Sequence, residues 1–154
     1  MKIVLLAVGR LGRSVEGQLA KDYAERATAA GRSLSLGPVE IIEVEARKPG
    51  KPAEAEVLLA QLADTHIIAC DEGGTARPSR AFADHIAMLR DQGVRRVAFV
   101  IGGADGLDAS VLRAARERLA FGPQTWPHAL ARTMLAEQIY RAVTILGGGP
   151  YHRD

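Results

Sequence analysis

Short apolar runs alternate with longer amphipathic segments along the whole chain. The runs that predict strands are Lys2–Val8, Val39–Val44, His66–Cys70 and Arg96–Ile101, with a further short strand within residues 120–127. Each is too short for a helix of ordinary length, and Gly, Pro or polar residues follow it. Strands that alternate with helical segments are typical of a parallel sheet with helices on both faces, so we expect an α/β fold.

The segments between these runs predict five helices, listed by range as 15–30, 53–63, 79–92, 108–119 and 128–146. The first is rich in Ala, Leu, Glu and Lys and stops at Gly31. Asp108 is a good N-cap for the fourth, because its carboxylate can accept from amides of the first turn. The run Val39–Val44 alternates polar and apolar residues, which predicts a strand near the sheet edge. Residues 47–52 read as a loop.

Composition narrows the class of protein. The 154 residues are 47% hydrophobic and 25% charged, which is typical of one globular domain spanning residues 1–154. The net charge is only +2, so any contact with nucleic acid must come from a local basic patch. No apolar run reaches membrane-spanning length, and the first strand is too short for a signal sequence. We therefore expect a cytoplasmic protein without a membrane partner.

Three segments that directly follow predicted strands are candidates for a ligand site: Asp71–Gly74, Gly102–Gly106 and Gly122–Pro127. In open parallel sheets, ligands bind beyond the carboxyl ends of the strands, so these segments are expected to converge on one pocket. The glycines allow close backbone approach and positive φ angles. Amides at the start of the helix after Asp108 would lie near the same pocket.

Several familiar chemistries are missing. The Gly-rich segment lacks the Lys-Ser/Thr of a P-loop, and Gly9-Arg10-Leu11-Gly12 gives only part of a dinucleotide-binding pattern. Four histidines stand singly and there is one cysteine, Cys70, so neither a metal site nor an internal disulfide is expected. No Ser sits on a Gly-x-Ser-x-Gly elbow. We expect His66 and His85 to be structural or exposed.

The last predicted helix carries apolar residues around more of its circumference than one core-facing stripe needs. This predicts packing on two sides, against the sheet and against a second subunit, with a central helix of a monomer as the alternative. Arg132 lies in the first turns, where a cation opposes the helix dipole, which indicates an anionic partner. Glu137 and Arg141 have the spacing of a helix salt bridge. The tail Pro150–Asp154 combines a stacking ring, a titratable imidazole and a permanent cation, which suits a phosphorylated or nucleotide partner, although a disordered tail is the alternative.

Four ordered motifs together carry a family resemblance. They are Val100–Leu107 (VIGGADGL), Trp126–Arg132 (WPHALAR), Leu135–Ala142 (LAEQIYRA) and Pro150–Arg153 (PYHR). With the opening Lys2–Gly9, they make the chain similar, over essentially its whole length, to the small SPOUT methyltransferases of the RlmH (YbeA) family. One departure is the Gly147–Gly149 run before the tail, where relatives often carry Asn-His.

The resemblance implies a homodimer with a C-terminal trefoil knot, an exception to the usual unthreaded connectivity. It implies S-adenosylmethionine-dependent methylation at N3 of a pseudouridine in helix 69 of 23S rRNA, on the assembled ribosome. The cofactor residues that it implies are Cys70, Asp71, Gly102, Gly103, Gly122, Pro123, Gln124, Thr125, Trp126 and Pro127. Two alternatives stay open: a non-catalytic ribosome-binding factor, and a SPOUT methyltransferase of a different RNA.

The tail supplies the expected catalytic residues. His152 has a suitable intrinsic pKa for a general base, Arg153 can stabilise negative charge on the uracil ring, and Tyr151 can stack on a base. Arg132 and Arg141 are the expected RNA-binding residues. Five further cations form a candidate ribosome-facing patch: Arg10, Arg13, Arg47, Lys48 and Lys51. For Arg47, Lys48 and Lys51, which share one predicted loop, a solvated basic turn is the favoured interpretation.

Overall fold

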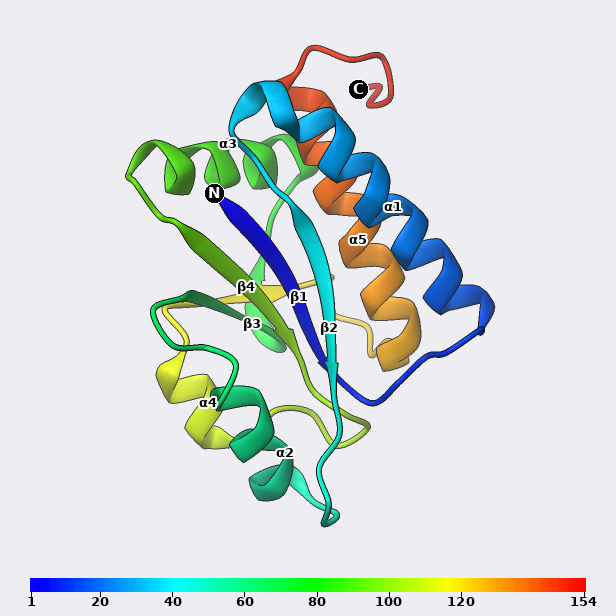
Figure 1. Ribbon diagram of the computed structural model, residues 1–154, viewed down its shortest axis with the longest axis vertical. Coiled ribbons are helices and arrows are strands. Elements are labelled where there is room, and N and C mark those ends of the chain that lie inside the picture. The colour runs from blue at the N-terminus through cyan, green and yellow to red at the C-terminus, as the bar shows by residue number, and fades with distance from the viewer.

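A five-stranded parallel sheet with the order β2-β1-β4-β3-β5 forms the centre of the molecule. Figure 1 shows it in a computed structural model that describes all of residues 1–154. The strands are β1 (Lys2–Val8), β2 (Val39–Val44), β3 (His66–Ala76), β4 (Arg96–Ile101) and β5 (Glu117–Ala120). Because every strand runs the same way, all five carboxyl ends lie along one edge of the sheet.

Helices cover both faces of the sheet, as the sequence predicts. They are α1 (Val15–Gly31), α2 (Lys51–Leu59), α3 (Ser79–Asp91), α4 (Ala109–Ala114) and α5 (His128–Leu146), with a 3-10 turn at Arg32–Leu34. On one face α1, α3 and α5 lie against the sheet, and on the other lie α2 and α4 (Figure 1). The α/β fold class is therefore confirmed.

The interior strand β1 is apolar along its length because both of its faces are covered by helices. Ile3, Leu5 and Ala7 join the core under α1, α3 and α5. The alternate residues of the strand, among them Val4 and Leu6, join the core under α2 and α4. All of these side chains are fully buried. The edge strand β2 buries only Val39, which confirms the edge position predicted from its alternation.

Two boundaries near the sheet edge differ from the prediction. The strand β3 does not end at Cys70 but continues to Ala76, with a register shift against β5 between Cys70 and Thr75. The helix predicted to reach Leu119 ends at Ala114, and β5 begins at Glu117. Leu119 becomes buried by pairing with β3, so a tertiary contact overrides the local helix propensity.

Smaller differences concern α2. The helix spans residues 51–59 rather than 53–63, so the predicted loop at 47–52 is two residues too long. Pro52 lies in the first turn, where its missing amide hydrogen costs the helix nothing. The last helix, α5, has the bounds that the sequence predicts.

The contact between β3 and β5 makes a prediction about Gly74. A Cβ built on Gly74 would lie 2.7 Å from backbone carbons of Arg118 and Leu119. We expect Gly74→Ala to lower the free energy of unfolding by about 1–3 kcal/mol, because one strand must shift away from the other. Urea denaturation measures this.

The matched control is Gly149→Ala, whose Cβ would meet its nearest atom at an ordinary 3.5 Å. That variant should stay within about 0.5 kcal/mol of the parent. Equal stability of the two variants would contradict the tight approach of the strands at Gly74.

Candidate cofactor site and C-terminal tail

A cavity of about 630 Å³ opens at the carboxyl ends of β4 and β5 and at the part of β3 where its pairing with β4 has ended. Three segments form most of its wall: the Cys70–Glu72 part of β3, the Ile101–Leu107 segment after β4, and the Leu119–Trp126 segment around the end of β5. The predicted convergence of three strand-end segments on one pocket is therefore seen in the structure. The segment predicted as a loop at Asp71–Gly74 lies inside β3 but still reaches the cavity.

Most of the predicted cofactor residues line this cavity. They are Cys70, Asp71, Gly102, Gly103, Gly122, Gln124, Thr125 and Trp126. Pro123 and Pro127 are not part of the wall; Pro127 is the N-cap residue of α5. Sequence reasoning missed Lys51 and His128, which also line the cavity. Lys51 is the first residue of α2, and His128 is the first residue of α5. Helix N-termini at the ligand edge of a parallel sheet often face a bound group, so their position could have predicted both residues.

The segment after β4 is held tight by glycines. Gly106 donates its amide to the carbonyl of Gly103 at 3.1 Å and has a φ of +80°, which favours glycine. A Cβ on Gly102 would lie 2.6 Å from the carbonyl oxygen of Gly106. A Cβ on Gly103 would lie 2.8 Å from a carboxylate oxygen of Glu54. The wall of the cavity here is bare backbone, which can approach a ligand closely.

A helix cap fixes the end of the same segment. The Asp108 carboxylate accepts from the amide of Ser110 at 2.9 Å and from its hydroxyl at 2.6 Å. These hydrogen bonds, from the hydroxyl first, hold the pKa of Asp108 below its usual range. The predicted N-cap is confirmed, although the helix that it starts is shorter than expected.

The remaining wall comes from the segment between β5 and α5. The Trp126 indole nitrogen donates to the carbonyl of Phe121 at 3.3 Å, which closes this segment on itself. Gly122 has a φ of +96°, so it allows the turn directly after β5. Trp126 is 38% exposed, so a large aromatic face remains free beside the cavity.

The one thiol in the cavity wall belongs to Cys70. No group of three or more metal-ligating side chains exists in the structure. Burial raises the pKa of the Cys70 thiol to about 12, so the thiol is neutral at physiological pH. In a separate finding, no helix is long and apolar enough to cross a membrane.

The C-terminal tail is ordered against its own chain. The Tyr151 hydroxyl donates to Glu137 Oε1 at 3.0 Å, and its ring lies 4.7 Å from that of Tyr140. His152 Nδ1 is 3.1 Å from an Arg141 guanidinium nitrogen, and Asp154 forms an ion pair with Arg80 on α3. This overturns the alternative of a disordered tail.

The Gly147–Gly149 run ends α5. Gly148 has a φ of +71°, and Gly149 donates its amide to the carbonyl of Thr144 at 2.9 Å. A left-handed residue with a hydrogen bond back to the last turn is a common helix C-cap. The tail therefore leaves α5 in a defined direction and folds back along it.

None of the tail residues lines the cofactor cavity of the same chain. Glu137, which Tyr151 contacts, lies nine residues after His128, and nine residues span about 14 Å of helix. Arg141 is occupied by Glu137, at 3.0 Å from Nε, and its guanidinium lies 4.9 Å from the centre of the Tyr151 ring. The predicted salt bridge with Glu137 is confirmed, and Arg141 acts within this chain as a support of the tail.

Arg132 requires a correction. The predicted anionic partner was RNA, but the structure gives Arg132 an internal one, because Glu43 of β2 lies 2.8 Å from Nη1. The Arg132 side chain is 1% exposed, so it is buried and cannot serve as an RNA-binding residue in this structure. Desolvation lowers the pKa of Arg132, and the nearby Glu43 carboxylate opposes that change. The sequence did not show that a strand far along the chain supplies the counter-charge.

Two further predictions about single residues have clear outcomes. His66 and His85 are mostly buried on either side of Glu117, at 2.6 and 2.5 Å from its carboxylate oxygens, so both are structural.

The two-sided packing predicted for α5 is seen, but α1, α3 and the sheet of the same chain supply both sides. The cations Arg10 and Arg13 are exposed in the loop after β1.

The fold agrees with comparisons to known proteins. The family model described as "Predicted SPOUT methyltransferase" matches residues 1–152, so the chain belongs to this family of methyltransferases. The RlmH resemblance is confirmed by curated relatives. The chain is 72% identical to "Ribosomal RNA large subunit methyltransferase H" of Caulobacter sp. (strain K31), over 100% of both chains.

The protein of the same name from Caulobacter vibrioides is 71% identical over 100% of this chain and 99% of its own length. Among solved structures, a probable methyltransferase from Bordetella pertussis Tohama I matches with a TM-score of 0.52 at 14% identity. That match covers 92% of this chain and 96% of the other, and it supports the fold alone.

The raised pKa of Cys70 predicts slow alkylation of its thiol. At pH 8 a free thiol, with a pKa of about 8.5, is partly the reactive thiolate, whereas a thiol with a pKa of about 12 is almost entirely protonated. At pH 8 we expect iodoacetamide to modify native Cys70 more slowly than the unfolded chain, because burial disfavours the reactive thiolate. Mass spectrometry of timed samples measures both rates. Similar rates at pH 8 would contradict a desolvated thiol in the wall.

Proposed function

We propose that this protein transfers the methyl group of S-adenosylmethionine to N3 of a pseudouridine in helix 69 of 23S rRNA, acting as a homodimer on assembled ribosomes in the cytoplasm. The observation that carries the proposal is the cavity at the carboxyl ends of β4 and β5 and the Cys70–Glu72 part of β3, in a chain of the SPOUT methyltransferase family. Full-length relatives at about 70% identity that are named as large-subunit rRNA methyltransferases support the RNA target.

The cavity fits the cofactor chemically. Bare backbone at Gly102 and Gly103 lets amides and carbonyls reach the adenine, and the exposed face of Trp126 can cover the ligand. When bound, the cofactor supplies an electrophilic methyl on a sulfonium. The chain then has to align N3 with that methyl and help to remove the N3 proton.

The C-terminal tail is the best source of the groups that align N3 and remove its proton. His152 can accept the proton, Arg153 can stabilise the charge that develops on the ring, and Tyr151 can stack on the base. Because no tail residue reaches the cavity of its own chain, we assign the completing tail to the second subunit. Arg10 and Arg13 are exposed cations that can contact RNA phosphates, and Arg141 would act through the tail that it supports.

An exposed apolar patch on α1 and α5 supports the homodimer. Val15 is 79% exposed, and Leu19 and Leu130 are each about two-fifths exposed. Large apolar side chains that gather on neighbouring helices mark a surface suited to burial against another protein. A twofold dimer across this patch would place α1 and α5 of one subunit beside those of the other. The trefoil knot implied by the family remains a prediction.

The direct test is methyl transfer from tritiated S-adenosylmethionine to ribosomes from a strain that lacks the gene, followed by mass spectrometry of the helix 69 fragment. The proposal expects one added methyl group on a pseudouridine of that fragment. A methyl group found elsewhere would favour a methyltransferase of a different RNA. Ribosome binding without cofactor binding or transfer would favour a non-catalytic factor.

The role of the tail gives a further prediction. His152→Ala should lower the rate of transfer by about a hundredfold or more, which is the usual contribution of a general base. Cofactor affinity should stay the same, because the proposed role of His152 is toward the N3 proton of the RNA base and not toward the cofactor. Single-turnover kinetics and isothermal titration calorimetry measure the two quantities.

The matched control for that experiment is His85→Gln, which removes another partly buried imidazole far along the chain from the tail. It should leave the rate of transfer nearly unchanged. Full activity of a chain truncated after Gly149 would show that the tail has no catalytic role.

A further inference from the structure

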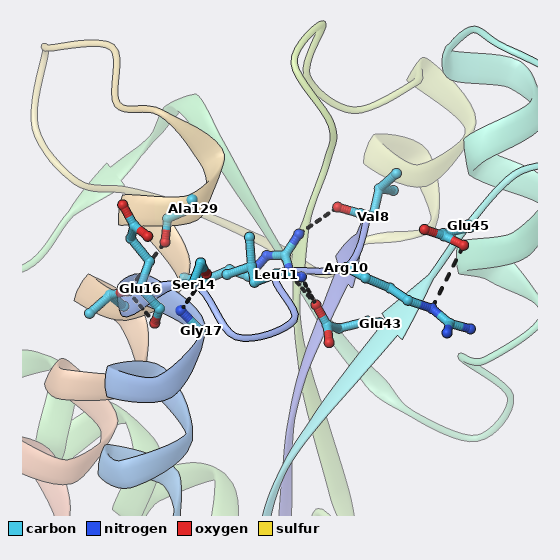
Figure 2. Close-up of polar contacts among 11 residues, drawn as sticks. Val8, Arg10, Leu11, Ser14, Glu16, Gly17, Glu43, Glu45 and Ala129 are labelled. Carbon is cyan, nitrogen blue, oxygen red and sulfur yellow. Dashed lines mark hydrogen bonds and ion pairs between the residues drawn. The ribbon is translucent and has the colours of Figure 1, made fainter.

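Arg132 is the only buried charged side chain in the protein. It lies in the second turn of α5, where Nη1 donates to Glu43 Oε2 at 2.8 Å and Nη2 donates to the carbonyl of Val8 at 2.5 Å. Figure 2 labels Glu43 and Val8, and dashed lines join them to this guanidinium. The remaining guanidinium nitrogen, Nε, is buried without a hydrogen-bond partner.

These contacts of Arg132 contribute little to the free energy of folding. A buried ion pair is often no better than apolar side chains of similar volume, because both charges must give up water. The unpartnered Nε adds a further desolvation cost. A buried charge with such costs indicates a role in fixing the position of something else.

The segment that Arg132 fixes is the loop between β1 and α1, residues 9–14. Glu43 Oε2, which binds Arg132, also accepts from the amide of Leu11 at 2.7 Å. The next residue of α5, Thr133, donates its hydroxyl to the carbonyl of Glu16 at 3.1 Å. With the bond to Val8, the first turns of α5 therefore hold the β1–α1 loop before, within and after its length (Figure 2).

The same turns of α5 touch the cofactor cavity. His128 and Ala131 line the cavity, and α5 begins directly after the Gly122–Pro127 segment. Ala131 lines the cavity, and the next two residues, Arg132 and Thr133, contact the ends of the β1–α1 loop. A shift of the first turns of α5 would therefore move both the cavity wall and the β1–α1 loop. That loop presents the exposed cations Arg10 and Arg13.

We propose that Glu43, Arg132 and Thr133 are positioning residues that couple the cofactor cavity to RNA binding by the β1–α1 loop. Cofactor in the cavity fixes the first turns of α5, which fix the loop in the position that meets RNA phosphates. Thermodynamic linkage then requires RNA to raise the affinity for cofactor by the same factor. This proposal rests on the proposed function, because it takes the ribosomal RNA as the ligand of Arg10 and Arg13.

The test measures the Kd of the full protein for ribosomes with and without S-adenosylhomocysteine, which occupies the cofactor site but cannot react. For the parent protein we expect binding about tenfold tighter with S-adenosylhomocysteine. In Glu43→Gln this factor should fall to less than about twofold, because Arg132 loses its charged partner. The Kd for S-adenosylhomocysteine without RNA should change by less than about threefold. An unfolded variant would lose this affinity together with the coupling factor, so the two measurements separate lost coupling from lost fold.

The matched control is Glu40→Gln on the same strand, which removes the carboxylate of an exposed ion pair with Lys2. It should keep the parent's coupling factor. A folded Glu43→Gln variant with the parent's factor overturns the proposal. If thermal melts show that Glu43→Gln is unfolded, Thr133→Val decides, because it removes only the hydroxyl contacts; its factor should fall at least about threefold, and an unchanged factor overturns the proposal.

The parent protein separates this proposal from the proposed function. Methyl transfer to ribosomes without any coupling between RNA and S-adenosylhomocysteine would overturn the coupling and leave the function in place. Absence of both transfer and S-adenosylhomocysteine binding would overturn the proposed function itself.

Discussion

The parallel direction of all five strands is the constraint on which the rest of the molecule depends. It places the carboxyl ends of β4 and β5 and the Cys70–Glu72 part of β3 at one edge, where backbone groups that no longer pair within the sheet can meet a ligand. The cavity follows from that placement and from glycines that let the segment after β4 turn tightly, because a Cβ on Gly102 would clash with the backbone of Gly106. Backbone of this segment and larger side chains such as Trp126 and Lys51 share the wall.

The second constraint is the position of α5. This helix begins at the cavity, packs against α1, α3 and the sheet, and ends where the tail folds back along it. One helix therefore connects the cavity, the buried Arg132 contacts and the tail. Glu43 of β2 contacts this helix through Arg132, although other strands form the cavity wall.

Local patterns were enough to predict the elements whose burial is uniform. The run Lys2–Val8 is buried on both faces, and α5 has a strong start at Pro127 and a strong stop at the glycine run, so their bounds follow from the sequence. The errors lie where a distant segment decides. β5 exists because Leu119 pairs with β3, and Arg132 is buried because Glu43 lies beside it. The strand-end pattern indicated the three segments that line the cavity, and the family resemblance added the individual residues predicted to bind the cofactor.

The most direct measurement is a crystal structure of the protein soaked with S-adenosylhomocysteine. The account predicts density for the ligand in the cavity formed by the Cys70–Glu72, Ile101–Leu107 and Leu119–Trp126 segments, with its adenine against the backbone of Gly102 and Gly103. Density in the separate cavity among α1, α3 and α5, or none at saturating concentration, would contradict the central claim that the strand ends form the cofactor site.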